Sequence, residues 1–466
     1  MKLFSAVTYA RKNLSGKGVK SYNSIIANIL ATLLLRIASR ASFVLLSFYL
    51  GERVASAAVV AVVLEAFYVS EILLAPVVGS LSDRLGRKPF LLLAPLLGCG
   101  AALCLLAATY LEPHPNIEAF DSRLVLLLLI VLIGRLLEGA TTALNAPASL
   151  GSLTDSTIGS ETLRTRAMTA FEVVTVGGLA LGIPFGGMVS QWLGTNGFFV
   201  IMALHLLNML VLLCLLRESV HHEAETHTYG SLTESLKLLS NRHIFALLPA
   251  WLAINALIGA WITLTTIILA YSKKMAEARH PGQLLYGGFS QGSATLVLTT
   301  FALVFLIGMS IWMLLLPRMR RALVMLLGLG GLGVSIAALT LINGLGDTLM
   351  SLSASARFWL CVLLPLVGMG ILFLSGFTQA ALNQMAAIAE KLSGKRGAVM
   401  GLYSVVLGIG QLGGALLGGV AADMMGFYGL MLFSLVLGLL ALGSVLYMYM
   451  RGDDLVMSDV SSGNRE

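Results

Sequence analysis

Long, almost unbroken runs of apolar residues alternate with short polar segments over most of the 466-residue chain. Each run is long enough to cross a bilayer, because a membrane-spanning helix needs about 20 mostly apolar residues. The apolar–polar alternation of membrane barrel strands is missing from these runs, so the pattern predicts helices. We predict twelve spans, at residues 24–50, 55–79, 89–110, 123–147, 166–190, 196–216, 245–271, 293–316, 322–343, 357–384, 397–422 and 427–450.

The longest polar break in mid-chain covers residues 217–242 and divides the predicted spans into six and six. We therefore expect an all-α membrane protein with two pseudo-symmetric six-helix bundles. The expected parts are an N-terminal segment, a first bundle, a linker, a second bundle and a tail, at residues 1–23, 24–216, 217–244, 245–450 and 451–466.

An internal repeat supports this division, because residues 164–197 align with residues 396–429 at a constant offset of 232. The fifth and eleventh spans then run in the same direction, as in two halves related by an axis along the membrane normal. Glycines one turn apart predict close helix contact, and two such smooth faces could also slide as the halves rock. The coinciding glycines are Gly178, Gly182, Gly186, Gly187, Gly194 and Gly197, which fall on Gly410, Gly414, Gly418, Gly419, Gly426 and Gly429.

The composition agrees with a membrane protein and accounts for the positive net charge. Hydrophobic residues make up 57% and charged residues 11% of the chain, against about 45–50% and about 25% in soluble domains. The formal charge of +7 arises from Lys and Arg residues that gather before the first span and in alternate loops. Cytoplasmic segments collect bases in this way. We therefore expect a multi-pass plasma membrane protein with both termini in the cytoplasm, and no binding to nucleic acid.

The loop between the second and third predicted spans reads G-S-L-S-D-R-L-G-R-K-P, from Gly79 to Pro89. Its glycines permit a tight turn, its acid can sit at a helix N-terminus or pair with a base, and its bases favour the cytoplasmic side. In a chain with twelve spans, this loop resembles the signature G-x-L-a-D-R-x-G-R-K of the major facilitator superfamily. The conformational-switch residues of the match are Gly79, Asp83, Arg84, Gly86, Arg87 and Lys88.

The resemblance implies a fold of two six-helix bundles around a central cavity, lined by the first, fourth, seventh and tenth spans. It also implies that Asp83 and the bases of the loop form a charge-linked latch that takes part in conformational switching. Arg135 with Gly139 resembles the R-x-x-x-G element that proton-driven members of the family use in proton transfer. Gly178 to Gly187 is similar to the antiporter element, but Ile183 interrupts its adjacent glycine and proline.

Seven ionisable residues lie inside predicted spans, all of them in the first half of the chain. Each costs about 2.5–3.5 kcal/mol at the centre of a membrane helix, so seven unpaired groups would cost on the order of 20 kcal/mol. They must therefore pair, titrate or contact water. The seven are Arg36, Arg40, Glu65, Glu71, Arg135, Glu138 and Glu172.

Two interpretations of these charges stay open. Burial favours the neutral form of a carboxyl group and a nearby base favours the charged form. Movement of Arg135 relative to Glu138 or Glu65 would then load and release a proton, whereas a static ion-pair network would only fix helix packing. Glu71 and Glu172 lie nearer the cytoplasmic end, where they could instead pair with loop bases. The proton-coupling candidates are Glu65, Glu71, Arg135, Glu138 and Glu172.

The solute site has candidates in both halves. Arg36 and Arg40 are four residues apart on one helix face, and two guanidinium groups in a cavity wall would hold a carboxylate or a phosphate. Pairing with Glu65 or Glu138 is the alternative. Neutral polar and aromatic residues of the second half would complete the wall. The substrate-binding candidates are Arg36, Arg40, Tyr68, Trp251, Asn255, Trp261, Gln379 and Asn383.

The sequence favours a secondary active transporter of a small solute that works by alternating access in the bilayer. No ATP-binding G-x-x-x-x-G-K-[ST] segment is present, so the expected energy source is a proton gradient, without a cofactor. Acids confined to one half favour proton-coupled efflux of an amphiphilic, drug-like compound. Transport of an organic anion, proton-linked or facilitative, and lipid flipping are the alternatives.

Other classes of function find little support in the chain. No nucleophile, base and metal-ligand set clusters as an enzyme would require, so we expect no enzymatic activity. The linker histidines His221, His222 and His227 have no cysteine partner with metal-ligand spacing, so we expect no metal site. We expect a monomer.

Overall fold

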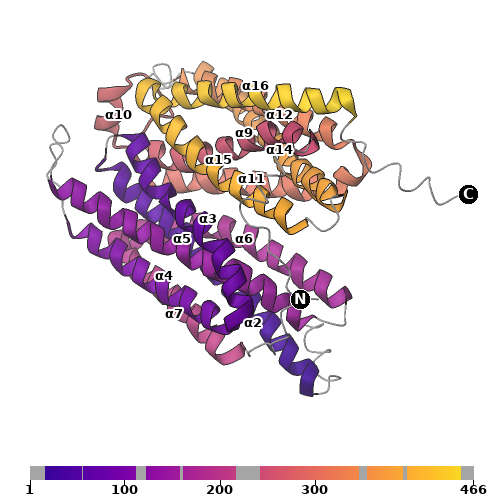
Figure 1. Cartoon of the computed structure of the whole chain (residues 1–466). Helices are drawn as coiled ribbons and strands as arrows, with labels where there is room; N and C mark the ends of the chain where they lie inside the picture. The colour runs from indigo at the N-terminus through magenta and orange to yellow at the C-terminus, as the bar shows by residue number, and fades with distance from the viewer. Residues whose placement is uncertain are drawn as a thin grey trace, which may run out of the picture. The chain divides into compact units, whose positions relative to one another are not determined.

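The computed structural model describes residues 16–54, 56–111, 122–157, 161–216, 242–345, 354–391 and 396–452, and within these ranges it contains helices and no strand. Twelve long helices account for most of the described chain (Figure 1). A short helix, α10 (Lys273–Arg279), follows α9. The long helices are α2 (Gly16–Gly51), α3 (Ala57–Leu85), α4 (Lys88–Thr109), α5 (Ser122–Ser156), α6 (Glu161–Leu193), α7 (Gly197–Leu215), α9 (Arg242–Ala270), α11 (Gln291–Leu315), α12 (Arg321–Asn343), α14 (Ala354–Lys391), α15 (Arg396–Met425) and α16 (Phe427–Arg451).

Each of the twelve predicted spans corresponds to one of these helices, so the prediction of a twelve-helix membrane protein is confirmed. In the described residues, eleven helical stretches are long and apolar enough to cross a membrane. One of these stretches, Arg166–Leu215, contains α6 from Arg166 onward and all of α7. Residues 1–15 of the N-terminal segment, most of the 217–244 linker and most of the tail lie outside the described residues, and residues 16–23 belong to α2.

Several helices continue past the apolar runs from which they were predicted. Helix α5 continues from residue 147 to Ser156, and α3 continues from residue 79 to Leu85, because backbone hydrogen bonding does not depend on apolar side chains. The expectation that Gly79 belongs to the turn is therefore wrong, since Gly79 lies within α3. Gly86 is the turn residue, and its φ of 92° is a backbone conformation that favours glycine.

The described chain forms two compact units whose boundaries cross two helices. The first unit contains α2 up to Leu45, α3 from Val69, and α4 to α7. The second unit contains the rest of α2 from Leu46, the start of α3 up to Tyr68, and the helices from α9 onward. The division into bundles at 24–216 and 245–450 stays a prediction.

Glycines of α6 lie directly against α2 in the first unit. A β-carbon added at Gly178 would lie 2.7 Å from Cβ of Arg36, and one at Gly182 would lie 2.7 Å from Cβ of Arg40. A β-carbon at Gly186 would approach the backbone of Ala41 just as closely. Real side chains do not approach to this distance, so the spacing of α6 and α2 depends on glycine.

The same kind of contact recurs in the second unit between α15 and α9. A β-carbon added at Gly410 would lie 2.7 Å from Cβ of Asn255, and one at Gly414 would overlap the backbone of Ala256. The glycines of α15 lie 232 residues after those of α6 in the sequence. The residues that they contact on α9 lie 219 residues after those contacted on α2. By this relation Asn255 takes the place that Arg36 has in the first unit. The close helix contact predicted from the glycine repeat is present in both halves.

We expect Gly414→Ala to lower the apparent melting temperature of the purified protein in detergent. The added methyl group overlaps α9, and overpacking of this kind costs about 1–3 kcal/mol. Gly413→Ala is the matched control, because a β-carbon at Gly413 meets nothing within 4 Å. The control should be neutral or slightly stabilising, since alanine exceeds glycine in helix propensity. Equal melting temperatures for the two variants would contradict the close contact.

Candidate functional site

The middle of α5 carries an ion pair that is buried in the first unit. Nη1 of Arg135 bonds to Oε2 of Glu138 one helical turn later, and the two side chains are 4% and 3% exposed. Thr142 and Asn145 of the same helix are also buried, so this face of α5 points into the unit. The hydroxyl group of Ser42 lies beside Glu138. Burial of either charge alone would cost several kcal/mol, so each charge depends on the other.

Phe43 of α2 lies within cation–π distance of two guanidinium groups. Cζ of Arg40 is 4.9 Å, and Cζ of Arg135 5.7 Å, from the centre of its ring. Such contacts contribute about 0.5–2 kcal/mol. One turn before Arg40, Arg36 interacts electrostatically with Glu71 of α3. The first unit therefore provides a partner for each of the arginines predicted to lie in its spans.

Glu65 has its hydrogen-bond partner within the second unit. It is 4% exposed on the segment of α3 that belongs to the second unit. Its Oε1 accepts a hydrogen bond from Oγ1 of Thr263 on α9, which is fully buried. The hypothesis that movement of Arg135 relative to Glu138 or Glu65 loads and releases a proton stays a prediction.

The N-terminus of α3 is capped by a residue of α15. Oδ2 of Asp423 accepts hydrogen bonds from Oγ of Ser56 at 2.6 Å and from the backbone N–H of Ala58 at 3.2 Å. Oδ1 accepts one from the backbone N–H of Ala57 at 2.7 Å. These backbone groups are among those that a helix leaves unsatisfied at its start. Nη1 of Arg279, 3.7 Å from Oδ1, adds an ion pair.

Aromatic and imidazole groups surround this cap. His280 and Tyr286 pack edge to face with ring centres 4.7 Å apart. Burial lowers the pKa of His280 below its ordinary value, and burial together with the Asp423 carboxylate raises the pKa of Tyr286 to about 12. Both side chains are therefore mainly neutral at pH 7, and the Arg279–Asp423 pair carries the charge here.

We expect Asp423→Ala to lower the free energy of unfolding by about 1–2 kcal/mol, because loss of a capping carboxylate leaves the start of α3 unsatisfied. Asp423→Asn should lie between wild type and the alanine variant, since it keeps one acceptor oxygen. Thermal unfolding in detergent measures both. The cap is refuted if Asp423→Ala unfolds at the wild-type temperature.

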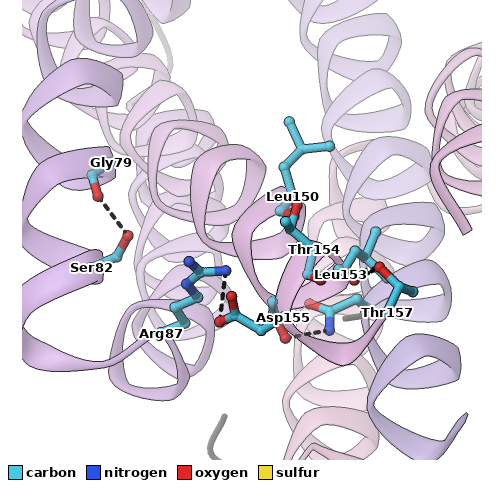
Figure 2. Close-up of polar contacts among 10 residues, drawn as sticks. Gly79, Ser82, Arg87, Leu150, Leu153, Thr154, Asp155 and Thr157 are labelled. Carbon is cyan, nitrogen blue, oxygen red and sulfur yellow. Dashed lines mark hydrogen bonds and ion pairs between the residues drawn. The ribbon is translucent and has the colours of Figure 1, made fainter. Parts of the chain in front are cut away.

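The turn between α3 and α4 is fastened to the end of α5 (Figure 2). Nη1 of Arg87 lies 3.0 Å from Oδ2 of Asp155, with side chains 17% and 29% exposed. A β-carbon added at Gly151 would overlap the Arg87 guanidinium, so glycine leaves the room this group needs. Lys88 is the first residue of α4. The side chains of Asp83 and Arg84 lie outside the described part of the chain, so the expected latch stays a prediction. Asp155 is an acid that the predicted latch did not include.

A double-mutant cycle with Arg87→Gln and Asp155→Asn should give a coupling on the order of 1 kcal/mol in thermal unfolding, because the pair is half-buried. The matched control is Lys273 with Glu277, an exposed pair at 3.7 Å with side chains 66% and 62% exposed. That cycle should give almost no coupling. Additive effects of Arg87→Gln and Asp155→Asn would show that the pair does not hold the turn.

The aromatic and amide substrate candidates contact neighbouring side chains or backbone groups. Nδ2 of Asn255 donates to the carbonyl of Trp251 at 2.8 Å, and Trp251 is buried. Nε1 of Trp261 donates to Oγ of Ser434 at 2.8 Å. Nδ2 of Asn383 donates to the carbonyl of Gln379 at 3.0 Å. Tyr68 packs edge to face on Phe67. Their role in binding stays a prediction.

Some predicted site residues have side chains outside the described part of the chain. Other residues of the site were not predicted. The side chain of Glu172 and the linker histidines His221, His222 and His227 lie outside the described part, and among described residues no group of three or more His, Cys, Asp or Glu could hold a metal ion. Asp155, Asp423 and the buried His205 of α7 were not predicted from the sequence. A polar residue within or beside an apolar run was the available signal for all three.

The chain is similar to known membrane transporters. The sequence model described as Major Facilitator Superfamily matches residues 29–288, more than half of the chain. The solved structure of nucleoside transporter NupG is 15% identical, with a TM-score of 0.61, covering 90% of this chain and 99% of that one. A mutant of that transporter gives 14% identity and a TM-score of 0.63, covering 92% and 99%. A D-xylose-proton symporter gives 14% and 0.61, covering 92% and 97%. No curated protein sequence matches the chain.

These matches define a secondary transporter fold, which agrees with the resemblance seen in the loop at Gly79. The chain belongs to the major facilitator superfamily. It is a multi-pass membrane transporter of a small solute rather than an enzyme.

Proposed function

We propose that this transporter exports an amphiphilic compound in exchange for protons, and that Glu138 is the residue that gains and loses the proton. The observation that carries the proposal is the burial of Arg135 and Glu138 at 4% and 3% exposure. A carboxylate in an apolar interior stays charged only while a cation lies next to it, and otherwise the protonated form is favoured. Separation of Arg135 from Glu138 is therefore coupled to uptake of one proton.

Phe43 is a second partner of Arg135 in addition to Glu138. Its ring attracts the guanidinium group from 5.7 Å. Arg40 lies over the same ring at 4.9 Å, and two cations on one ring repel each other. A shift of Arg40 with α2 would therefore change how favourable it is for Arg135 to leave Glu138. This links movement of a helix to the protonation of the carboxylate.

The preference for an amphiphilic solute rests on stacked aromatic side chains in the second unit. Trp261 stacks with Phe301 at 6.2 Å between ring centres, and Phe301 stacks with Phe305 at 6.3 Å. Such flat aromatic surfaces bind the apolar part of a solute. If solute and proton bind in turn, an inward proton gradient drives the solute outward through alternating access.

An organic anion is the second candidate, on the basis of Arg36 and Arg40. It is less favoured because Arg36 interacts with Glu71, and Arg40 with the ring of Phe43. The similar structures include a nucleoside transporter and a D-xylose-proton symporter, and the latter is consistent with proton coupling. We expect a monomer in the plasma membrane with both termini cytoplasmic.

The test uses purified protein in liposomes that contain a pH-sensitive dye, challenged with ethidium as a cationic amphiphile and with benzoate as an organic anion. Ethidium should move protons across wild-type vesicles beyond the rate in protein-free vesicles. Glu138→Gln should reduce that movement at least about tenfold, because the amide cannot carry a proton. Glu52→Gln is the matched control, since this acid has a side chain 49% exposed at the end of α2.

Three outcomes separate the candidates. Proton movement with ethidium that depends on Glu138 and not on Glu52 supports the proposal. Movement with benzoate alone, lost in Arg40→Ala, favours the organic anion. Wild-type vesicles that respond to neither probe, or a Glu138→Gln variant as active as wild type, contradict proton coupling through Glu138.

A further inference from the structure

A histidine lies inside the first unit at a position that the proposed function does not use. His205, on α7, is 2% exposed. Among the described residues, neither ring nitrogen has a hydrogen-bond partner. Its ring packs against the backbone of α4, where a β-carbon added at Gly98 would overlap the imidazole. The packing at Gly98 holds the ring in one place, deep within the bundle.

A small gap, too narrow for a water molecule, is lined by this histidine and by the acid of the ion pair, and we call it the pocket. His205 lines it from α7, Glu138 and Thr142 line it from α5, and Ser39 lines it from α2. Within the described chain, the second carboxylate oxygen of Glu138 and the hydroxyl group of Thr142 also have no hydrogen-bond partner. Polar atoms without partners from two helices therefore border one small space.

This arrangement is unfavourable in the state that the structure describes. A buried polar group without a partner costs about 1–3 kcal/mol, and no apolar packing requirement calls for an imidazole here. A role in which these groups gain and lose protons explains their position better than a role in packing alone. A protonated imidazole beside a carboxylate would satisfy both, since charge-assisted hydrogen bonds are the stronger kind.

We infer that His205 is a second proton-carrying residue that exchanges a proton with Glu138 across this pocket. In the exchange, the O–H bond of the protonated Glu138 breaks and an N–H bond forms on the imidazole, leaving a carboxylate and an imidazolium ion. The hydroxyl group of Thr142 lies at the same pocket and is able to pass the proton on. The inference rests on the proposed function, because it extends the path of the same proton.

The charged and titratable groups around His205 are few. Glu138 faces it from α5, with Arg135 bound to Glu138. On α4 the titratable neighbour is Cys99, whose thiol donates to the carbonyl of Met202. In the described residues, α2 contributes no charged group to the pocket, and α6 contributes no residue. Departure of Arg135 would leave Glu138 as the acid that faces the imidazole.

The first test observes the imidazole directly and needs no transported solute. Protein labelled with ¹⁵N-histidine, in lipid nanodiscs, is titrated by NMR, and His205 is assigned among the seven histidines with His205→Gln, or His205→Asn if the first variant does not fold. Glu138→Gln should lower the titration midpoint of His205 by about one pH unit, because it removes the carboxylate that stabilises the imidazolium. A His205 signal that Glu138→Gln leaves unchanged would falsify the inference.

The second test measures proton movement with ethidium in the liposomes described above. His205→Gln should slow proton movement at least about tenfold, while His243→Gln, a half-buried histidine at the start of α9, should leave it unchanged. If His205→Gln moves protons as fast as wild type while Glu138→Gln does not, the inference fails and the proposed function stands. If wild type moves no protons, the proposed function fails, and the NMR titration alone decides whether His205 and Glu138 share a proton.

Discussion

The close approach of helices at glycine positions is the constraint on which the rest of this structure depends. In lipid there is little hydrophobic force between helices, so packing contacts must hold them together. Gly178 and Gly182 bring α6 onto α2, and Gly410 and Gly414 bring α15 onto α9 in the same way. Any side chain larger than hydrogen at these positions would separate the helices and displace the residues that they carry.

The two repeated contacts share a geometry and differ in chemistry. Arg36 in the first unit corresponds to Asn255 in the second, and Arg40 corresponds to Gly259, by the offset of 219 between the contacted residues. One copy of the contact therefore carries charge into the interior and the other does not. The charges of the first unit are compensated locally, as Arg135 and Glu138 illustrate. In the proposed function, the first unit handles protons and the second unit contacts the apolar part of a solute.

Other polar contacts hold helix ends in place. Arg87 joins the turn after α3 to Asp155 of α5, and Asp423 of α15 caps the start of α3. In each case the acid comes from a helix distant in sequence from the residues it binds. Contacts of this kind fix the position of a helix end against its neighbour, and a change of conformation in the transporter would have to break or preserve them.

The sequence by itself determined the membrane class, the twelve helices, the glycine repeat and the family, because apolar run length, glycine spacing and the loop at Gly86 are local patterns. It also placed Arg135 and Glu138 on one helix face, since residues three apart lie on the same side of a helix, but left Glu65 open as an alternative. It did not assign Thr263 to Glu65, Asp155 to Arg87 or Asp423 to the start of α3. Only the tertiary structure decided these pairs, and the pocket that Glu138 shares with His205, because they join helices far apart along the chain.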